Sequence, residues 1–421
     1  MMEHLIRARY WIETAFPVEK AAETMAGEQS TGTFTRVPGE TDELREQHGA
    51  RVESIRELES ASTPSLPGAY APPNNKPPVY RRAEVELSWP LSNLGPSLPN
   101  LVATVAGNLW ELNPFSGLRL LDLHLPPEFL NRYCGPQFGV AGTRRLSGVY
   151  DRPLIGTIIK PSVGLTPAAT AELAGKLAEG GIDFIKDDEL QADGPHCAFT
   201  ERLSAVMAIL RDHAARTGKM VMYAANITGE IDEMLQRHDQ LVAAGGTCVM
   251  VSIHSIGLPA LVALRRHAAV AIHGHRNGWG LFGRSPAIGI SFVAWQKLWR
   301  LAGIDHLHTN GIANKFCEPD DSVIASAREC LRPMFEGPGK GCEIMPVFSS
   351  GQTARQAPPT YAGLGSTDLI YAAGGGIMAH PGGIEAGVRS LHEAWQAAVE
   401  GIPLETYAAT HPDLWAALQR F

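Results

Sequence analysis

Residues from about 154 onward repeat a short apolar run followed by a helix-like segment, and this repeat constrains the fold more than any other feature of the chain. Strand-like runs occur at residues 155–159, 182–185, 220–224, 248–252, 269–272, 305–308, 344–348 and 369–372. Helical periodicity lies between them, for instance at residues 168–179, 200–217, 231–244 and 288–302. Eight such units in roughly 250 residues predict a (β/α)8 barrel. A doubly wound open sheet is the alternative, but no G-x-G-x-x-G follows the first strand, which weakens a dinucleotide-binding interpretation.

The first 145 residues have a different character. Strand patterns lie at residues 5–16, 79–90 and 118–125, and helical patterns at 18–27 and 100–110. Residues 40–58 are strongly charged, and the proline-dense stretch 63–78 is typical of an extended loop. We therefore expect an α+β (ferredoxin-like) domain at residues 1–145 and a C-terminal α/β barrel at residues 146–421.

Charge and composition exclude several functional classes. A net charge of −8 and a pI near 6.0 disfavour nucleic-acid and membrane-surface binding. No apolar run approaches the roughly 20 residues that span a bilayer, and no signal-peptide pattern is seen at the N-terminus. The six cysteines are scattered without CxxC spacing, which is typical of reduced thiols. We expect a cytoplasmic protein that binds a small molecule.

The second strand-like run, GIDFIKDDEL at residues 181–190, passes abruptly from apolar to charged residues. Its charged residues are Lys186, Asp187, Asp188 and Glu189. Carboxylates this close repel one another, so the cluster needs a bound cation or a network of ion pairs. A solvated acidic turn with a salt-bridged lysine fits these residues alone equally well. Side-chain alternation along a strand predicts that Asp187 points away from Lys186 and Asp188.

Polar residues also follow the other strand-like runs, where the catalytic face of a barrel lies. They are Lys160 after the first run, His273, His275 and Arg276 after the fifth, His306, His308, Thr309, Asn310 and Lys315 after the sixth, Ser349, Ser350 and Gly351 after the seventh, and Gly374, Gly375 and Gly376 after the eighth. Each of these residues alone is weak evidence for a functional site, since a histidine at a strand end more often has a structural role and a glycine-rich turn usually has no further function. Together they predict a metal-dependent enzyme acting on a phosphorylated carbonyl compound, with carboxylates for Mg2+, main-chain N–H groups for phosphate, and lysines and histidines to move protons.

These motifs, in this order and over nearly the whole chain, resemble those of the RuBisCO large-subunit superfamily. In that family the lysine matching Lys186 is carbamylated by CO2 and coordinates Mg2+ with the acids matching Asp188 and Glu189. A carbamate supplies an oxygen ligand that an ammonium cannot, which explains a lysine among hard-cation ligands. The resemblance thus implies Mg2+ and CO2, as a lysine carbamate, as cofactors.

The resemblance also implies roles for the remaining candidate residues. Lys160 matches a catalytic lysine, His275 a catalytic histidine, and Lys315 the lysine of a mobile lid. The residues that match substrate and phosphate ligands are Arg276, His308, Ser350, Gly351, Gly374 and Gly375. The residues that match those completing the partner subunit's active site are Glu28, Thr33 and Asn108. An obligate head-to-tail homodimer, or a multiple of dimers, is therefore expected.

Four departures from the RuBisCO pattern argue against CO2 fixation. Ser162 replaces a second lysine after the first strand, and Phe34 stands in place of a tryptophan. The lid reads NGIANKFCE, and Gln352 stands where a second glycine would allow close approach of a phosphate. We expect a RuBisCO-like protein whose substrate carries a single phosphate.

RuBisCO-like proteins share one reaction step, the formation or protonation of a metal-bound enolate. Retention of Lys160 favours a decarboxylase of a phosphorylated 3-oxo acid of the 3-oxo-isoapionate 4-phosphate type, and some members cleave this substrate hydrolytically. An isomerase or tautomerase acting on 5-methylthioribulose 1-phosphate or a related ketose phosphate is the alternative. A catalytically inactive scaffold is the third hypothesis, but a scaffold has no need of the retained lysines and acids.

Overall fold

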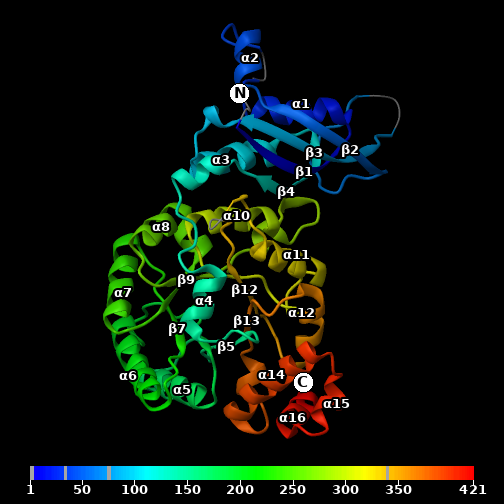
Figure 1. Ribbon diagram of the computed structural model, residues 1–421. Coiled ribbons are helices and arrows are strands. Elements are labelled where there is room, and N and C mark those ends of the chain that lie inside the picture. The colour runs from blue at the N-terminus through cyan, green and yellow to red at the C-terminus, as the bar shows by residue number, and fades with distance from the viewer. Residues whose placement is uncertain (1–3, 33–35, 74–76, 338–340) are drawn as a thin grey trace. The chain divides into compact units, whose positions relative to one another are not determined.

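The computed structural model describes residues 4–32, 36–73, 77–337 and 341–421. The chain forms two compact units (Figure 1). The first comprises Met1–Cys134, Gly278–Leu301 and Met334–Gly337, and the second comprises Gly135–Asn277, Ala302–Pro333 and Pro338–Phe421. Residues 278–301 follow a barrel strand in sequence, yet they group with the N-terminal residues, which the sequence pattern did not suggest.

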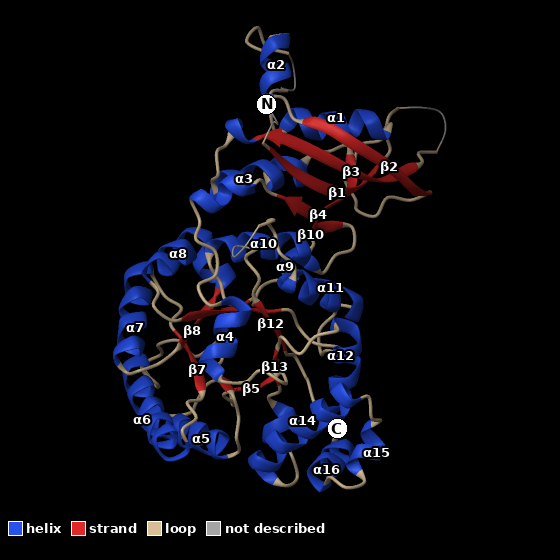
Figure 2. Cartoon of the chain, in the orientation of Figure 1, coloured by secondary structure: helices blue, strands red, loops and turns tan. Residues whose placement is uncertain are grey.

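The second unit contains a closed barrel of parallel strands, which confirms the predicted fold and excludes the open sheet (Figure 2). Its strands are β5 (Leu154–Ile158), β6 (Phe184–Lys186), β7 (Met222–Asn226), β8 (Cys248–Ser252), β9 (Ala271–His275), β11 (His306–His308), β12 (Met345–Phe348) and β13 (Ile370–Ala372). Adjacent strands pair in the order β11-β12-β13-β5-β6-β7-β8-β9. Because all the strands run in one direction, the polar residues that follow them share one end of the barrel.

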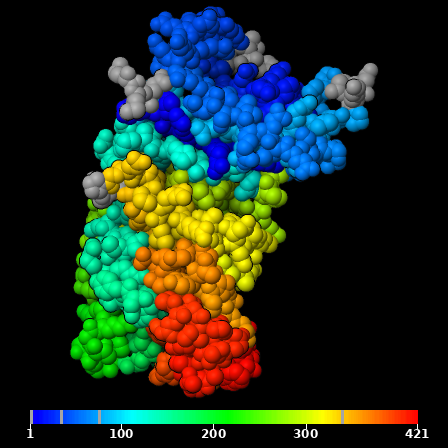
Figure 3. Space-filling model, turned by 45° about the vertical axis from the view of Figure 1, so that its right-hand side comes forward, coloured from blue at the N-terminus to red at the C-terminus, as the bar shows by residue number. Residues whose placement is uncertain are grey.

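Helices surround this barrel, as Figure 2 shows. They are α4 (Gly139–Ser147), α5 (Pro167–Glu179), α6 (Phe199–Thr217), α7 (Ile231–Ala243), α8 (Ile253–His267), α11 (Asp320–Leu331), α12 (Ala357–Leu364), α13 (Gly375–Met378), α14 (Gly383–Glu400), α15 (Leu404–Ala408) and α16 (Pro412–Arg420), with a short η4 (Ala354–Gln356). Local signals set their starts: the Thr166 side chain caps α5 by accepting from the Ala169 N–H, with proline at the first helical position. In Figure 3 the C-terminal helices α14 to α16 form one continuous orange-to-red surface.

The first unit is built on the sheet β10-β4-β1-β3-β2, in which β10 comprises Ile288–Ile290. Along the chain the elements are β1 (Leu5–Thr14), α1 (Val18–Glu28), α2 (Asp42–His48), β2 (Arg51–Ala61), β3 (Tyr80–Pro90), α3 (Leu98–Ala106) and β4 (Phe115–His124). This is the ferredoxin-like order βαββαβ with α2 added after α1. Three single-turn helices lie nearby, η1 (Leu91–Asn93), η2 (Asn108–Glu111) and η3 (Pro127–Asn131). The charged stretch after residue 40 contains α2 and β2. No strand pattern marks β2 in the sequence. Among the described residues this edge strand pairs with β3 alone and none of its own residues is buried, so its side chains do not alternate in polarity.

The predicted helix at residues 288–302 is wrong at its start. Residues 288–290 form strand β10 (Ile288–Ile290), which pairs in parallel with β4, and helix α10 (Phe292–Ala302) begins after it. Gly289 has a φ of +128°, and a Cβ atom there would lie 1.9 Å from the Phe282 carbonyl oxygen. Only glycine fits this close approach, so β10 runs beside the short helix α9 (Gly280–Gly283).

Apolar side chains fill the interior of the barrel. They include Phe184, Met222, Met250, Met345 and Val347, all essentially without solvent exposure. A packed interior leaves the strand ends as the place where polar chemistry can occur. Within the residues that the structure describes, no helix has the length and apolar character needed to cross a membrane.

Candidate active site

The predicted metal-site residues lie together at the end of β6. Lys186 is the last residue of the strand and is fully buried, Asp188 is 1% exposed, and the Glu189 side chain is 29% exposed. The Lys186 Nζ donates to the Asp187 carbonyl at 2.7 Å and lies 3.6 Å from Glu189 Oε2. Burial lowers the pKa of Lys186 and outweighs the neighbouring carboxylates, which act in the opposite direction. The neutral amine, the form that reacts with CO2, is therefore more populated at a given pH than in an exposed lysine.

Lys160, which follows β5, contacts the same cluster. Its Nζ lies 2.5 Å from Asp188 Oδ2 and donates to Ser162 Oγ at 2.8 Å. Burial alone would raise the pKa of Asp188, but hydrogen bonds from Lys160 and from the Leu190 N–H lower it overall. Asp188 is thus an ionised carboxylate, with a lysine beside an oxygen that a metal ion could use.

Asp187 points away from this cluster, which confirms the prediction from strand alternation. Its carboxylate accepts from the Tyr223 hydroxyl at 2.6 Å and from Arg202 Nε at 3.2 Å, and both partners are buried. The Asn226 N–H donates to it at 2.9 Å. Asp187 is therefore a structural ion-pair residue, whereas Asp188 and Glu189 are available as ligands.

His275 ends β9 and faces the same acids. Its Nε2 lies 3.4 Å from Glu189 Oε2, and its Nδ1 accepts from the Asn277 N–H at 3.2 Å. The same Nδ1 lies 3.3 Å from Asn277 Oδ1, so both ring nitrogens have a polar neighbour. Burial, together with the positive charge of Lys186, lowers the pKa of His275 to about 4, so the ring is neutral at physiological pH.

His308, at the end of β11, is held from two sides. Its Nε2 lies 2.9 Å from His273 Nε2, and its Nδ1 lies 2.9 Å from Ser349 Oγ. The His275 ring packs against it with a centroid separation of 4.5 Å. Burial lowers the pKa of both His273 and His308 well below the ordinary value, so the pair is neutral. His308 thus joins the ends of three neighbouring strands.

The predicted phosphate ligand Arg276 is paired with an acid that the sequence analysis missed. Its guanidinium contacts the Glu318 carboxylate, and the same Oε2 accepts from Asn310 Nδ2 at 2.7 Å. The Ser350 hydroxyl donates to Asn310 Oδ1 at 3.0 Å, which connects the ends of three strands. Glu318 lies in the irregular segment between β11 and α11, so no periodicity pointed to it.

The loop that carries Lys315 lies against the turn after β12. The Lys315 side chain is exposed, with Nζ 5.2 Å from the Phe316 ring centroid, and its N–H donates to the Ser350 carbonyl at 3.2 Å. Gln352 donates to the Ile312 carbonyl of this loop at 3.0 Å. The Gln352 side chain is therefore directed toward the loop, and its effect on a phosphate site stays a prediction.

The glycines expected to bind phosphate lie in two backbone turns. Ser350 and Gly351 both have left-handed backbone angles, with φ of 72° and 92°. Gly374 precedes the short helix α13, and a Cβ atom at Gly375 would meet nothing within 4 Å, so the backbone is open there. These turns follow β12 and β13, as the barrel prediction required.

Two of the three residues expected to complete a partner's site lie together in the first unit. Asn108 Nδ2 is 3.5 Å from Glu28 Oε1, although 80 residues separate them in sequence. Thr33 and Phe34 lie outside the described residues. The role of the Glu28–Asn108 pair stays a prediction.

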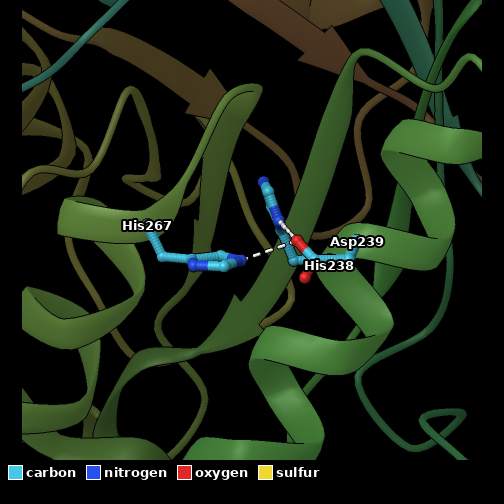
Figure 4. Close-up of side chains that lie close together, drawn as sticks. All are labelled: His238, Asp239 and His267. Atoms are coloured by element: carbon cyan, nitrogen blue, oxygen red, sulfur yellow. Dashed lines mark hydrogen bonds and ion pairs between the residues drawn. The ribbon is translucent and has the colours of Figure 1, made fainter.

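A second group of potential metal ligands lies on the outer helices, at His238, Asp239 and His267 (Figure 4). Both histidines contact Asp239 Oδ1, at 2.9 Å from His238 and 2.6 Å from His267. His238 Nε2 accepts from the Ala269 N–H at 3.1 Å, so the neutral ring carries its proton on Nδ1 and presents no lone pair to a cation. The group is a hydrogen-bonded link between α7 and α8.

The family model for the ribulose bisphosphate carboxylase large chain, catalytic domain, matches residues 139–421, and that for the N-terminal domain matches residues 3–129. The chain is 55% identical over 417 residues to the 3-oxo-isoapionate-4-phosphate transcarboxylase/hydrolase of Xanthobacter autotrophicus, covering 99% of each protein. It is 45% identical over 419 residues to the 3-oxo-isoapionate-4-phosphate decarboxylase of Rhizobium etli, again covering 99% of each. A crystal structure of a rubisco-like protein from Burkholderia fungorum superposes with a TM-score of 0.92 at 45% identity, covering 100% of each chain.

Proposed function

Because the chain belongs to the ribulose bisphosphate carboxylase large-chain family, we propose that it is a Mg2+-dependent decarboxylase of 3-oxo-isoapionate 4-phosphate. The observation that carries the proposal is the contact of Lys160 with Asp188 beside the buried Lys186. It puts a proton donor next to a set of hard-cation ligands, which is what decarboxylation through an enolate requires. The choice of substrate rests on two relatives that match the chain along nearly its whole length and whose names contain 3-oxo-isoapionate-4-phosphate.

The donor set fits Mg2+. Asp188 and Glu189 offer carboxylate oxygens, the ligand type that this hard cation takes. Lys186 would join them as a carbamate, and its burial and lowered pKa favour the neutral amine that adds CO2. When bound, the metal ion would supply positive charge beside the 3-oxo oxygen and so favour the enolate.

The protein residues would then perform two tasks. Arg276 and the main-chain groups around Gly351 and Gly375 would hold the phosphate. As the bond between the carboxylate carbon and the neighbouring carbon breaks, its electron pair moves toward the 3-oxo group, and CO2 leaves. Lys160 would then give its Nζ proton to the carbon that lost CO2, with the Ser162 hydroxyl holding the amine in place.

Hydrolytic cleavage is the second candidate, because the Xanthobacter relative carries the name transcarboxylase/hydrolase. A hydrolase adds water across a carbon–carbon bond and keeps the carboxyl carbon in an acid product. Neither of these relatives is named an isomerase, so the isomerase alternative is not retained.

The two reactions are separated by following the carboxyl carbon. The substrate is labelled with 13C at its carboxylate and incubated with enzyme, Mg2+ and unlabelled bicarbonate. Decarboxylation moves the label into CO2 and bicarbonate with formation of a ketose phosphate, whereas hydrolysis leaves it in a carboxylic acid. Turnover of neither kind by an enzyme that binds Mg2+ would refute the substrate assignment.

We also propose a homodimer in which Glu28 and Asn108 complete the partner's active site. Their proximity in the first unit supports a shared role. Mixing an inactive Lys186→Ala protein with an inactive Glu28→Gln protein should restore activity in hybrid dimers, since one of their two sites would then be intact. No recovery in hybrids that demonstrably form would contradict the shared site.

A further inference from the structure

Asn226, the last residue of β7, is fully buried and contacts the loop that carries the proposed metal ligands. We infer that Asn226 is a positioning residue that holds the backbone of Asp188 and Glu189, so that their carboxylates face the metal ion. The inference rests on the proposed Mg2+ site and concerns how that site is built. The rule that polar residues follow barrel strands would have pointed to Asn226, since it ends the third strand.

Three contacts carry the inference. The Asn226 side-chain amide donates to the Asp188 carbonyl at 3.1 Å and reaches the Glu189 carbonyl at 3.4 Å. The main-chain N–H of the same residue donates to Asp187 Oδ2 at 2.9 Å. Asn226 therefore contacts three consecutive residues of the charged run, and two of them, Asp188 and Glu189, are candidate metal ligands.

These contacts lie just beyond the point where the regular pairing of β6 with β7 ends. Regular pairing between β6 and β7 ends at Lys186, with one further bond from the Asp187 N–H to the Ala224 carbonyl at 3.2 Å. Asp188 and Glu189 lie beyond this ladder, in a turn closed by a bond from the Gln191 N–H to the Asp188 carbonyl. The Asn226 amide thus continues the attachment to β7 where the strand pairing has stopped. The carbonyl and the side chain of one residue are attached to the same Cα atom. Hydrogen bonds that hold the Asp188 and Glu189 carbonyls toward β7 therefore fix the directions in which their carboxylates point.

Neighbouring groups fix the orientation of the Asn226 amide. Its Oδ1 accepts from the Thr228 N–H at 3.1 Å and from the Thr228 hydroxyl at 2.7 Å. That hydroxyl accepts in turn from the Ser252 N–H at 2.9 Å, so its own proton is directed to Asn226. A flipped amide would put its NH2 group against two donors and its oxygen against two carbonyls. The ends of β6, β7 and β8 are therefore tied together through the side chains of Asn226 and Thr228, which hold the amide in a single orientation.

The test is metal affinity, measured without turnover. Mn2+ binding is followed by electron paramagnetic resonance in the presence of bicarbonate, for wild-type protein and for Asn226→Ala and Asn226→Asp. Loss of an outer contact to a metal ligand typically weakens affinity about 10- to 100-fold. We expect about a tenfold loss for Asn226→Ala, and a larger loss for Asn226→Asp, whose second oxygen would face the two carbonyls. The bound Mn2+ spectrum should broaden in both, as the ligand geometry becomes less uniform.

A second pair of variants keeps the test decisive if the Asn226 variants fold poorly. Thr228→Val removes the hydroxyl that orients the amide and should weaken Mn2+ binding, whereas Thr228→Ser keeps the hydroxyl and should restore it. The matched control is Thr170→Val, which removes another buried hydroxyl, one that donates to the carbonyl of Thr166, the residue that caps α5. This control should lose stability without losing affinity.

The outcomes separate this inference from the proposed function. Wild-type protein that binds no Mn2+ with bicarbonate overturns the metal site, and the role of Asn226 with it. Wild-type protein that binds, while folded Asn226→Ala binds equally well, overturns only the role of Asn226. Should the Asn226 variants not fold, equal affinity in Thr228→Val and Thr228→Ser would overturn that role in the same way.

Discussion

Replacing Lys160 by Met should have opposite effects on metal binding and on catalysis. The Lys160 Nζ lies 2.5 Å from Asp188 Oδ2, and the proposed function requires that carboxylate for Mg2+. Methionine keeps most of the length of the side chain and removes its charge. Because the lysine cation competes with the metal ion for the same acid, Lys160→Met should bind Mg2+ more tightly while losing the proton donor.

The structure sets the size of the first effect. A hydrogen bond to a charged group contributes about 1.5–3 kcal/mol. Asp188 is buried, but the Lys160 side chain is 43% exposed, so water screens the pair and the lower end of that range applies. At about 1.4 kcal/mol per tenfold change in affinity, the Mg2+ dissociation constant should fall about 10-fold. Loss of a general acid lowers kcat by about 100- to 10,000-fold.

Isothermal titration with Mg2+ in bicarbonate buffer measures the first effect, and turnover of the 3-oxo acid phosphate measures the second. Ser162→Ala is the control, since it removes the other partner of Lys160 but leaves the charge in place. Its Mg2+ affinity should stay near that of the wild type. Unchanged or weaker Mg2+ binding by Lys160→Met would refute the competition, and an unchanged kcat would refute the role of Lys160 as proton donor.

Three further predictions follow from buried residues. Lys186→Ala should abolish Mg2+ binding and the 13C carbamate signal from labelled bicarbonate; either one persisting would contradict the ligand assignment. His306 has a pKa of about 3 in the folded protein because it is buried, below the unfolded value of about 6.5. The unfolded chain therefore binds more protons below pH 6.5, and lowering the pH from 7 to 5 should cost about 2 kcal/mol of stability through this residue. Urea midpoints should show a smaller loss in His306→Gln, and an equal loss would argue against this origin. Tyr223→Phe removes a donor to the buried Asp187 and should cost about 1.5–3 kcal/mol of unfolding free energy without weakening Mg2+ binding, whereas weaker binding would place Asp187 in the metal site.

The pairing of Arg276 with Glu318 shows what a sequence pattern cannot supply. The sequence predicted Arg276 as a site residue because it follows a barrel strand, and the residues that follow barrel strands lie at the catalytic end of the barrel. Glu318 lies 42 residues further along the chain, in an irregular loop. Since such loops have no period, only the path of the chain brings that carboxylate to the guanidinium.

The sequence by itself determined the barrel, the ferredoxin-like domain and most of the candidate site. Strand–helix repetition is a local property, because burial of each strand and of one helix face is recorded in the order of apolar residues. The same regularity placed Lys160, Lys186, His275 and His308 at strand ends, and strand alternation separated Asp187 from its neighbours.

Only the tertiary structure decided which of these residues touch. The ion pair of Lys160 with Asp188 and the attachment of the ligand loop to Asn226 both join different strands. The addition of β10 to the N-terminal sheet likewise joins segments more than 150 residues apart, through a close approach that only Gly289 permits. Such contacts depend on strand register and on chain packing in three dimensions, and neither leaves a periodic trace in the amino-acid sequence.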